Sequence, residues 1–269
     1  MEKQILKPSL AVLAALTCTL PAVAQTAEEP KAITPYADIR YRLELIGQDG
    51  LPENATASTL RVRAGFKTRE WSGFSALVEG DAIARVGPRH YNDTVNGLTA
   101  YPIVADPSDV LLNQAWLRYK PVKEVETVLG RQAVNFDNQR WIGSVGWRQN
   151  DQTLDAARVT IKPMKGVSVD YGYAWRVNRI FGPDSPQGIW RDNNIHMVRA
   201  NFEAKPVGTV TTYGYFLDLP DAPLSSSKTI GVRLAGEQKL SSKAKLLYAA
   251  EYANQRDLGS NPRNFSLDY

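Results

Sequence analysis

The sequence predicts an all-β protein, an antiparallel transmembrane β-barrel of the up-and-down type. Three observations predict it. Apolar and polar residues alternate with a period of two in many segments, as in strands that have one face in lipid and one in water. Short and long connections alternate between these segments, which is typical of barrels with short periplasmic turns and long outer loops. The N-terminus also carries the pattern of an export signal.

The export signal defines three regions of the chain. A basic start and a mainly apolar run lead to small residues at a cleavage point after Ala24. We therefore predict a signal peptide at 1–24, a periplasmic tail at 25–34 and a barrel domain at 35–269. The apolar run is shorter than the ~20 residues that a membrane-spanning helix needs. Cys18 is the only cysteine and lies in the signal, so the mature chain is expected to have no disulfide.

The strand assignments follow from the alternation. In the segment 36–45, apolar residues alternate with Asp38, Arg40, Arg42 and Glu44. A Lys or Arg that faces lipid at mid-membrane costs about 2–4 kcal/mol, so the charged set must face the lumen. Further strands are predicted near 60–67, 74–82, 110–120, 124–133, 152–162, 167–178, 194–204, 209–218, 228–238 and 244–255. Another strand begins at Asn264 and stops at Tyr269. We therefore expect about 11–12 strands and an incomplete barrel.

The connections differ in length in a regular order. Short turns are predicted near 69–73, 121–124, 163–166, 205–208 and 239–243. Long loops are predicted near 46–58, 86–109, 133–151, 179–193, 219–227 and 255–263. This order places the N-terminus in the periplasm. Aromatic residues such as Tyr213 and Tyr215 are expected on the lipid face, as interfacial girdles.

One stretch, 129–158, carries a resemblance to a known family. Gly130–Gln132, residues 136–140, Trp147–Gln149 and residues 155–158 resemble the alginate export family of bacterial outer-membrane barrels. The resemblance implies a barrel channel in the outer membrane with an anionic or polar saccharide as its solute. It also implies a longer chain, because similar members close a larger barrel.

The loop inside that stretch is the expected centre of the channel. We expect residues 135–150 to fold into the barrel or across its mouth, anchored by Trp141 and Trp147, because disordered segments avoid tryptophan. The alternative is an ordinary surface loop with an aromatic anchor. Simple alternation would aim Arg131 at lipid, unless the strand has already ended there or a bulge at the preceding glycine turns Arg131 inward. Asp155 is expected at the rim or in a bulge.

Charged residues of the lumen and this loop form the predicted pore lining. Rings of Lys and Arg favour anions and rings of carboxylates favour cations, so a cationic constriction would select acidic solutes. For most of these residues the alternative is a salt-paired position on a polar wall. The predicted lining residues are Arg131, Arg140, Arg148, Arg158, Arg61, Arg63, Arg118, Arg176, Glu79 and Asp81.

Other classes of function have little support in the sequence. Only His90 and His196 are present, and neither has an evident serine partner for nucleophilic catalysis. Glu79 and Asp81 could serve a glycosidase, but paired carboxylates on a porin wall are commoner as electrostatic lining. We predict no enzyme activity, no cofactor, no metal centre and no nucleic-acid partner. Acidic residues in the long loops could bind calcium, although their spacing is not diagnostic.

The resulting hypothesis is an outer-membrane channel for passive passage of anionic polysaccharide or related polar solutes. Its partners would be that solute and the lipid of the outer membrane. One alternative is a general or small-anion-selective porin. Another is a surface adhesin or structural barrel whose lumen is plugged.

Overall fold

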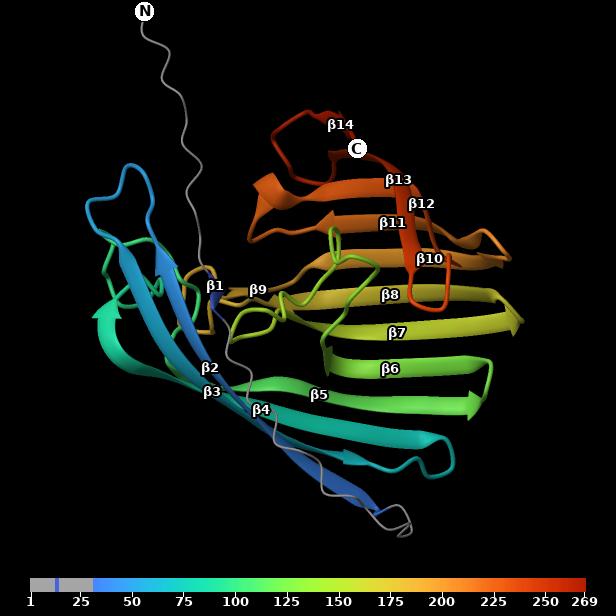
Figure 1. Cartoon of the computed structure of the whole chain (residues 1–269), viewed down its shortest axis with the longest axis horizontal. Coiled ribbons are helices and arrows are strands. Elements are labelled where there is room, and N and C mark those ends of the chain that lie inside the picture. The colour runs from blue at the N-terminus through green and yellow to red at the C-terminus, as the bar shows by residue number, and fades with distance from the viewer. Residues whose placement is uncertain (1–12, 15–30) are drawn as a thin grey trace, which may run out of the picture.

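A computed structural model describes residues 13–14 and 31–269 of the chain, so nearly all of the predicted signal peptide lies outside the described residues. The described part is a single antiparallel meander in which each strand pairs with the next along the chain, except that β10 pairs with β8 and the short β9 lies off this path (Figure 1). The strands are β1 (Leu13–Ala14), β2 (Ile33–Ile46), β3 (Ala55–Thr68), β4 (Phe74–His90), β5 (Asp109–Val122), β6 (Val125–Gln132), β7 (Thr153–Met164), β8 (Val167–Asn178), β9 (Ile189–Trp190), β10 (Asn194–Ala204), β11 (Gly208–Asp218), β12 (Ser227–Lys239), β13 (Lys245–Asp257) and β14 (Ser266–Asp268).

The predicted strand order is confirmed. Each predicted strand has a counterpart within a few residues at either end, and the main difference is β4, which continues to His90. The short β9 was not predicted; it pairs with β8 from within the connection 179–193. In the described part of the chain, β2 and β14 do not pair with each other, so the sheet is open. The same part contains no helix long and apolar enough to cross a membrane.

The predicted alternation of connections is also present. Residues 69–73, 123–124, 165–166, 205–207 and 240–244 form the short connections, and the intervening loops are longer, up to the 133–152 loop. Antiparallel pairing places all the short turns at one end of the sheet and the long loops at the other. In Figure 1 the turns after β5 and β7 lie at the right, and the loops after β2 and β4 lie at the left.

The two faces of the sheet have different surroundings. The 133–152 loop, hereafter the inner loop, lies against one face, which we call the inner face; the opposite one is the outer face (Figure 1). On β2 and β3 the predicted apolar set is exposed on the outer face, with Ile39 59% and Phe66 41% accessible. Arg42 and Arg61 are buried on the inner face, as the alternation predicts.

The prediction for β11 is wrong. Tyr213 and Tyr215 are 4% and 1% accessible and lie on the inner face, packed with the inner loop and not in a lipid girdle. The register pairs Tyr213 with Arg199, another inner-face residue. Gly231 lies beside the Tyr213 ring, where a Cβ would come within 2.4 Å of the phenol oxygen. Because Gly231 of β12 has no side chain, the Tyr213 ring has room beside it.

The main apolar core lies between the inner loop and the sheet. Val134, Phe136 and Ile142 of the loop pack against apolar and aromatic residues of β7, β8, β10, β11 and β13. The alanines of this core are fully buried, and their small side chains leave room for the loop against the strands. The sheet residues of this core are Leu154, Ala156, Ala174, Val177, Ile195, Met197, Tyr213, Tyr215 and Ala253.

Gly130 has a different role from the predicted one. Its φ is +122°, and a Cβ there would lie 2.3 Å from the carbonyl oxygen of Ala115, so the close strand contact requires glycine. The register of β6 continues through Gly130 without a shift and places Arg131 beside Asp155. The predicted irregularity at Asp155 is present, as a register shift between β7 and β8.

Candidate functional site

The inner loop crosses the inner face in two halves with different chemistry. Its first half, residues 133–143, rests on the apolar core over β7–β13. Its second half, residues 144–151, is bound by polar and charged side chains of β2 and β3. The loop therefore joins the two sides of the curved sheet across the space that they enclose (Figure 1).

Phe136 anchors the first half. Its ring is 6% accessible and stacks on Tyr215 at 6.0 Å between centroids. The guanidinium carbons of Arg199 and Arg158 lie 4.4 and 5.4 Å from the centroid of the same ring. Such cation–π contacts are stronger when the pair is desolvated. Arg158 was predicted as lining; Phe136 was not, although it belongs to the stretch that carries the family resemblance.

Trp141 is the second anchor of the first half, as predicted. Its indole N–H donates to Glu251 Oε1 at 3.0 Å, and the Tyr213 hydroxyl donates to the same oxygen at 2.5 Å. Arg233 closes the group through an ion pair of 3.1 Å with the other oxygen of Glu251. Arg140, next to this anchor, is exposed, and its guanidinium lies 5.5 Å from the Trp141 ring centroid.

Four arginines on β2 and β3 hold the second half; we call Arg40, Arg42, Arg61 and Arg63 the arginine ladder. Arg40 donates to the carbonyl of Gly146 at 3.0 Å and to that of Arg148. Arg42 donates to the carbonyl of Trp147 at 2.5 Å. Arg61 donates to the carbonyl of Gln149 at 3.4 Å. A loop with irregular backbone thus has its carbonyls satisfied by cations of the wall.

Gln149 is the central contact between loop and ladder. The side chain is fully buried, and its Oε1 accepts from Arg40 Nε at 3.1 Å. Its Nε2 donates to the Thr59 hydroxyl at 3.0 Å and to the carbonyls of Thr59 and Arg40 at 3.2 and 3.3 Å. Its backbone N–H donates to Asp106 Oδ1 at 3.1 Å. Gln149 was not among the predicted lining residues, although it stands in the stretch that carries the family resemblance.

The structure exchanges the predicted roles of Trp147 and Arg148. Trp147, the predicted anchor, is 54% accessible and covers the guanidinium of Arg148 at 4.2 Å. The Arg148 side chain is only 12% accessible and pairs with Glu44 at 2.9 Å. Burial lowers the pKa of Arg148, while Glu44 acts in the opposite direction. Arg148 thus fixes the loop, because its charge is matched by the wall.

Asp106 connects a second loop to this junction. It lies in the 91–108 connection, is fully buried, and its Oδ2 is 3.7 Å from Arg42 Nε. Burial raises the pKa of Asp106, and the Arg42 charge opposes that shift. The Tyr91 hydroxyl donates to the Asp106 carbonyl at 3.3 Å. The two longest loops therefore meet over the end of β2.

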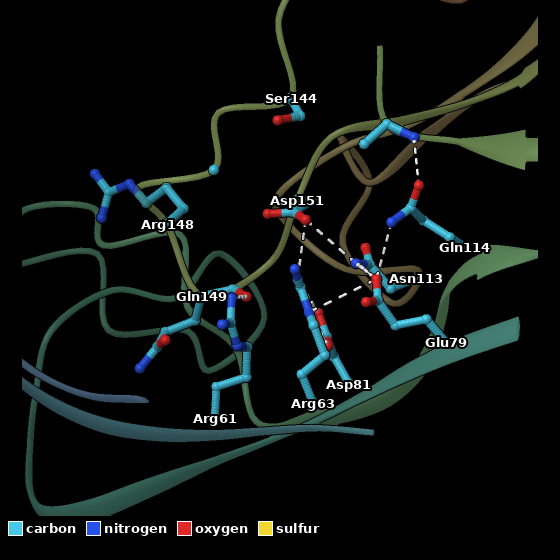
Figure 2. Close-up of polar contacts among 12 residues, drawn as sticks. Arg61, Arg63, Glu79, Asp81, Asn113, Gln114, Ser144, Arg148, Gln149 and Asp151 are labelled. Carbon is cyan, nitrogen blue, oxygen red and sulfur yellow. Dashed lines mark hydrogen bonds and ion pairs between the residues drawn. The ribbon is translucent and has the colours of Figure 1, made fainter. Parts of the chain in front are cut away.

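A dense polar cluster lies deeper on the inner face (Figure 2). Arg63 forms a two-point ion pair with Asp81, with both N–O distances at 2.7 Å, and reaches Asp151 of the inner loop at 2.9 Å. Figure 2 shows Arg63 between these two carboxylates. The cluster therefore ties the end of the loop to β3 and β4.

Glu79 is the hub of the neighbouring hydrogen bonds. Its oxygens accept from Asn113 at 2.7 Å, from Gln114 at 3.0 Å and from Tyr36 at 2.6 Å. Two consecutive residues of β5 reach the same carboxylate because the β4–β5 register shifts between Glu79 and Gly80. Glu79 and Asp81 are 5% and 1% accessible. Their oxygens are engaged by protein groups, an arrangement of structural lining and not of an acid–base pair open to substrate.

The remaining predicted residues lie apart from this cluster. Arg118 is near the short turns, where it contacts Ser75 at 2.9 Å and Glu70 at 3.4 Å. Arg131 and Arg176 share Asp155, at 2.7 and 3.7 Å. Leu154 and Ala156 pack into the core, and Asp155 stands between them in the strand. Because Arg131 pairs with Asp155, it does not lie with Arg158 at the foot of the inner loop. Among residues 13–14 and 31–269, no group of three His, Cys, Asp or Glu side chains is placed to hold a metal ion.

Solved structures of outer-membrane porins share this fold. OccAB2 of Acinetobacter baumannii superposes with a TM-score of 0.64 at 16% identity, covering 88% of this chain and 60% of that one. OccAB3 of the same organism gives 0.61 at 14% identity, with 88% and 60% covered. OccD3 (OpdP) of Pseudomonas aeruginosa gives 0.59 at 13% identity, with 87% and 50% covered. The chain thus spans about half to three fifths of the length of these porins.

The sequence comparison extends beyond the stretch that first suggested a family. A search of curated proteins found no match. The alginate export family, in contrast, matches residues 89–261, from the end of β4 to the loop after β13. That match contains the entire inner loop and the strands on which its first half packs. With its open porin-type meander and its loop folded across the inner face, the chain belongs to the alginate export family.

Proposed function

We propose that this chain forms the wall and the constriction of an outer-membrane channel through which anionic polysaccharide or related polar solutes pass by diffusion. The observation that carries the proposal is the inner loop, held across the inner face by the arginine ladder and by the anchors Phe136 and Trp141. Loops that narrow a pore bring charge close to a passing solute. Membership of the alginate export family supports the same class of solute.

The proposal includes the route to the membrane. Export through the inner membrane would use the signal peptide at 1–24, cut after Ala24, and the short turns would face the periplasm. N-terminal sequencing of protein extracted from the outer membrane tests the cleavage point. A chain that still begins at Met1 would contradict it.

Charge pairing decides which cations can act on a solute. Among the residues that the structure describes, no carboxylate lies within ion-pair distance of Arg40, Arg140 or Arg158, whereas Arg148 and Arg131 are paired. Of the three, Arg140 is the most exposed and lies on the loop itself. We therefore propose Arg140 as the main solute-facing charge of the loop, with Arg148 as a residue that fixes its position.

The test is the reversal potential of the reconstituted protein in a planar bilayer under a salt gradient. At ~10 Å and an effective dielectric constant of about 20, a unit charge interacts with a passing ion by roughly 1.7 kcal/mol. Salt at 0.1 M reduces this to roughly 0.6 kcal/mol. Arg140→Glu changes the charge by two units, which disfavours an anion by roughly 1.2 kcal/mol and favours a cation by the same amount. We therefore expect the anion-to-cation permeability ratio to fall roughly fiftyfold.

Two controls accompany this substitution. Arg69→Glu makes the same change of charge in an exposed short turn and should leave the ratio unchanged. Arg140→Gln should give about half the shift, expressed as free energy. If Arg140→Glu and Arg69→Glu behave alike, the loop does not form the selective part of the pore.

Solute block separates this function from its alternatives. A channel for anionic polysaccharide should be blocked by oligouronates at lower concentration than by neutral oligosaccharides of equal length, and Arg140→Glu should weaken the block. A small-anion porin would show anion selectivity without this preference. Absence of conductance from correctly folded protein would support a plugged structural barrel and contradict the channel.

A further inference from the structure

The outer face carries a hollow of about 1130 Å³ over β10–β14, on the side opposite the inner loop. Small residues form its floor: Ala200 and Gly214 lie on neighbouring strands between the larger Val198, Phe216 and Ile230. Because register partners on adjacent strands share a face, the floor continues across β12 and β13. The register partners form two rows across β10–β13. The first row is Val198, Gly214, Ile230 and Asn254, and the second is Ala200, Thr212, Val232 and Tyr252.

Two cations stand at the loop end of this hollow. Lys228 and Arg256 are register partners on β12 and β13 and line the hollow with Phe216. Like charges directly opposite each other destabilise a strand pair. Within residues 31–269 neither cation has a carboxylate at ion-pair distance. Arg256 Nε donates to Asn254 Oδ1 at 2.9 Å, and Asp268 of the hollow attracts Arg256 from beyond ion-pair distance.

The same two strands offer a comparison at their other end. Lys239 and Lys245 are also register partners, but Lys245 forms an ion pair of 2.9 Å with Glu237, which offsets the repulsion. In the described part of the chain, no carboxylate lies at ion-pair distance from Lys228 or Arg256. The nearest acidic group of the hollow is Asp268, whose Oδ1 already accepts from Tyr252 and Asn254, both at 2.9 Å. The pair at the loop end thus leaves a place for an external anion.

We propose that this hollow binds a lipid that carries a phosphate group, with the phosphate between Lys228 and Arg256 and an acyl chain along the floor. The rows of the floor lie two and four residues beyond the cations, roughly 7 and 13 Å along the strand. Guanidinium and ammonium groups bind phosphate through charge-assisted hydrogen bonds. Apolar residues such as Val198, Ile230 and Val232 suit a hydrocarbon chain.

The position in the fold agrees with a lipid and not with a free anion. Lys228 is one residue inside β12, next to the long-loop end, where a headgroup would meet a membrane-spanning sheet. The hollow continues from there over the outer face, and most of its lining below the cations is apolar or small. A free phosphate would use only the cations and leave that floor without a function. The proposal does not depend on which solute the channel passes.

The experiment is native mass spectrometry of the full protein in detergent micelles, titrated with dimyristoyl phosphatidic acid or dimyristoyl phosphatidylcholine. We expect the wild-type protein to retain phosphatidic acid at least tenfold better than phosphatidylcholine. Lys228→Gln with Arg256→Gln should abolish that preference and leave phosphatidylcholine binding unchanged. Lys239→Gln with Lys245→Gln removes the same charge from the same strands and should behave as wild type.

A second variant tests the floor. Gly214→Leu fills the hollow, and its new Cβ meets only the Phe216 ring, at 3.1 Å. We expect it to lower retention of both lipids at least fivefold. Equal binding of the two lipids by wild type, or loss of preference in both double variants alike, would overturn the proposal. So would displacement of phosphatidic acid by millimolar inorganic phosphate, which would indicate a site for the free anion.

Discussion

Replacing Gln149 by leucine should release the second half of the inner loop from the wall. Leucine has a similar size, so the change removes hydrogen bonds more than packing. The lost bonds are one from Arg40 to Oε1 and those from Nε2 to Thr59 and the Arg40 carbonyl. A bond to a charged group contributes about 1.5–3 kcal/mol and a neutral one about 0.5–1.5 kcal/mol. We take about 3 kcal/mol for the set, toward the low end of that sum.

That free energy corresponds to a roughly hundredfold larger undocked fraction. Tryptic cleavage after Arg148 measures it, because the Arg148 carbonyl is bound by Arg40 and its side chain by Glu44. When opening is fast relative to cleavage, the rate follows the open population. We expect Gln149→Leu to raise the rate ten- to a hundredfold, after normalisation to the unfolded protein.

The matched control is Gln152→Leu. This glutamine lies at the end of the same loop, but its side chain bonds only to the Gly143 carbonyl at 3.2 Å, within the loop. It should change cleavage after Arg148 less than threefold. Equal rates in wild type, Gln149→Leu and the control would refute the view that Gln149 holds the loop on the ladder.

Two further substitutions test the wall itself. Arg63→Met leaves the carboxylates of the polar cluster without their cation and should lower the free energy of unfolding by about 3–5 kcal/mol. Heat-modifiability gels would show this as a lower temperature at which the folded band is lost. Arg69→Met, in an exposed turn, should have no such effect. Gly130→Ala should reduce the folded yield severely, because the new Cβ would lie 2.3 Å from a carbonyl oxygen. Gly87→Ala is the control: Gly87 also has a positive φ but has open space around it, so this variant should show only the smaller cost of backbone strain.

Strands and connections could be predicted because their signals are local. In β2 and β3 charged residues occupy one parity and apolar residues the other, so the cost of charge in lipid identifies both faces. β11 lacks that signal. Neither of its two alternating sets of side chains carries a charge up to Leu217, so alternation alone cannot tell which set faces inward. The inner position of Tyr213 and Tyr215 is set by contacts with the inner loop, about 70 residues away in the chain.

The candidate site was predicted in part for a related reason. Trp141, Trp147 and the loop arginines pointed to the segment that the structure places across the inner face, because tryptophan is unusual in a disordered loop. Which of these side chains is buried depends on the residues of the sheet that each one contacts. Glu44 and Asp106 draw Arg148 inward, and no local pattern around Arg148 reveals them. The bulge that turns Asn113 and Gln114 toward Glu79 likewise depends on the pairing of β4 with β5.

The arginines of the inner face act mainly as ligands for the protein itself. A passing acidic solute would compete with Glu44 for Arg148 and with Asp81 for Arg63, and both pairs are held by short, partly buried contacts. Arg40 differs, because its partners are neutral carbonyls and Gln149, which satisfy its hydrogen bonds without cancelling its charge. The Arg140 guanidinium lies over the Trp141 and Tyr269 rings, which also leave its charge uncancelled. In the channel that we propose, the cations that position the loop would therefore differ from those that act on the solute. Charge reversal at Arg148 would therefore report on loop docking, and reversal at Arg140 on selectivity.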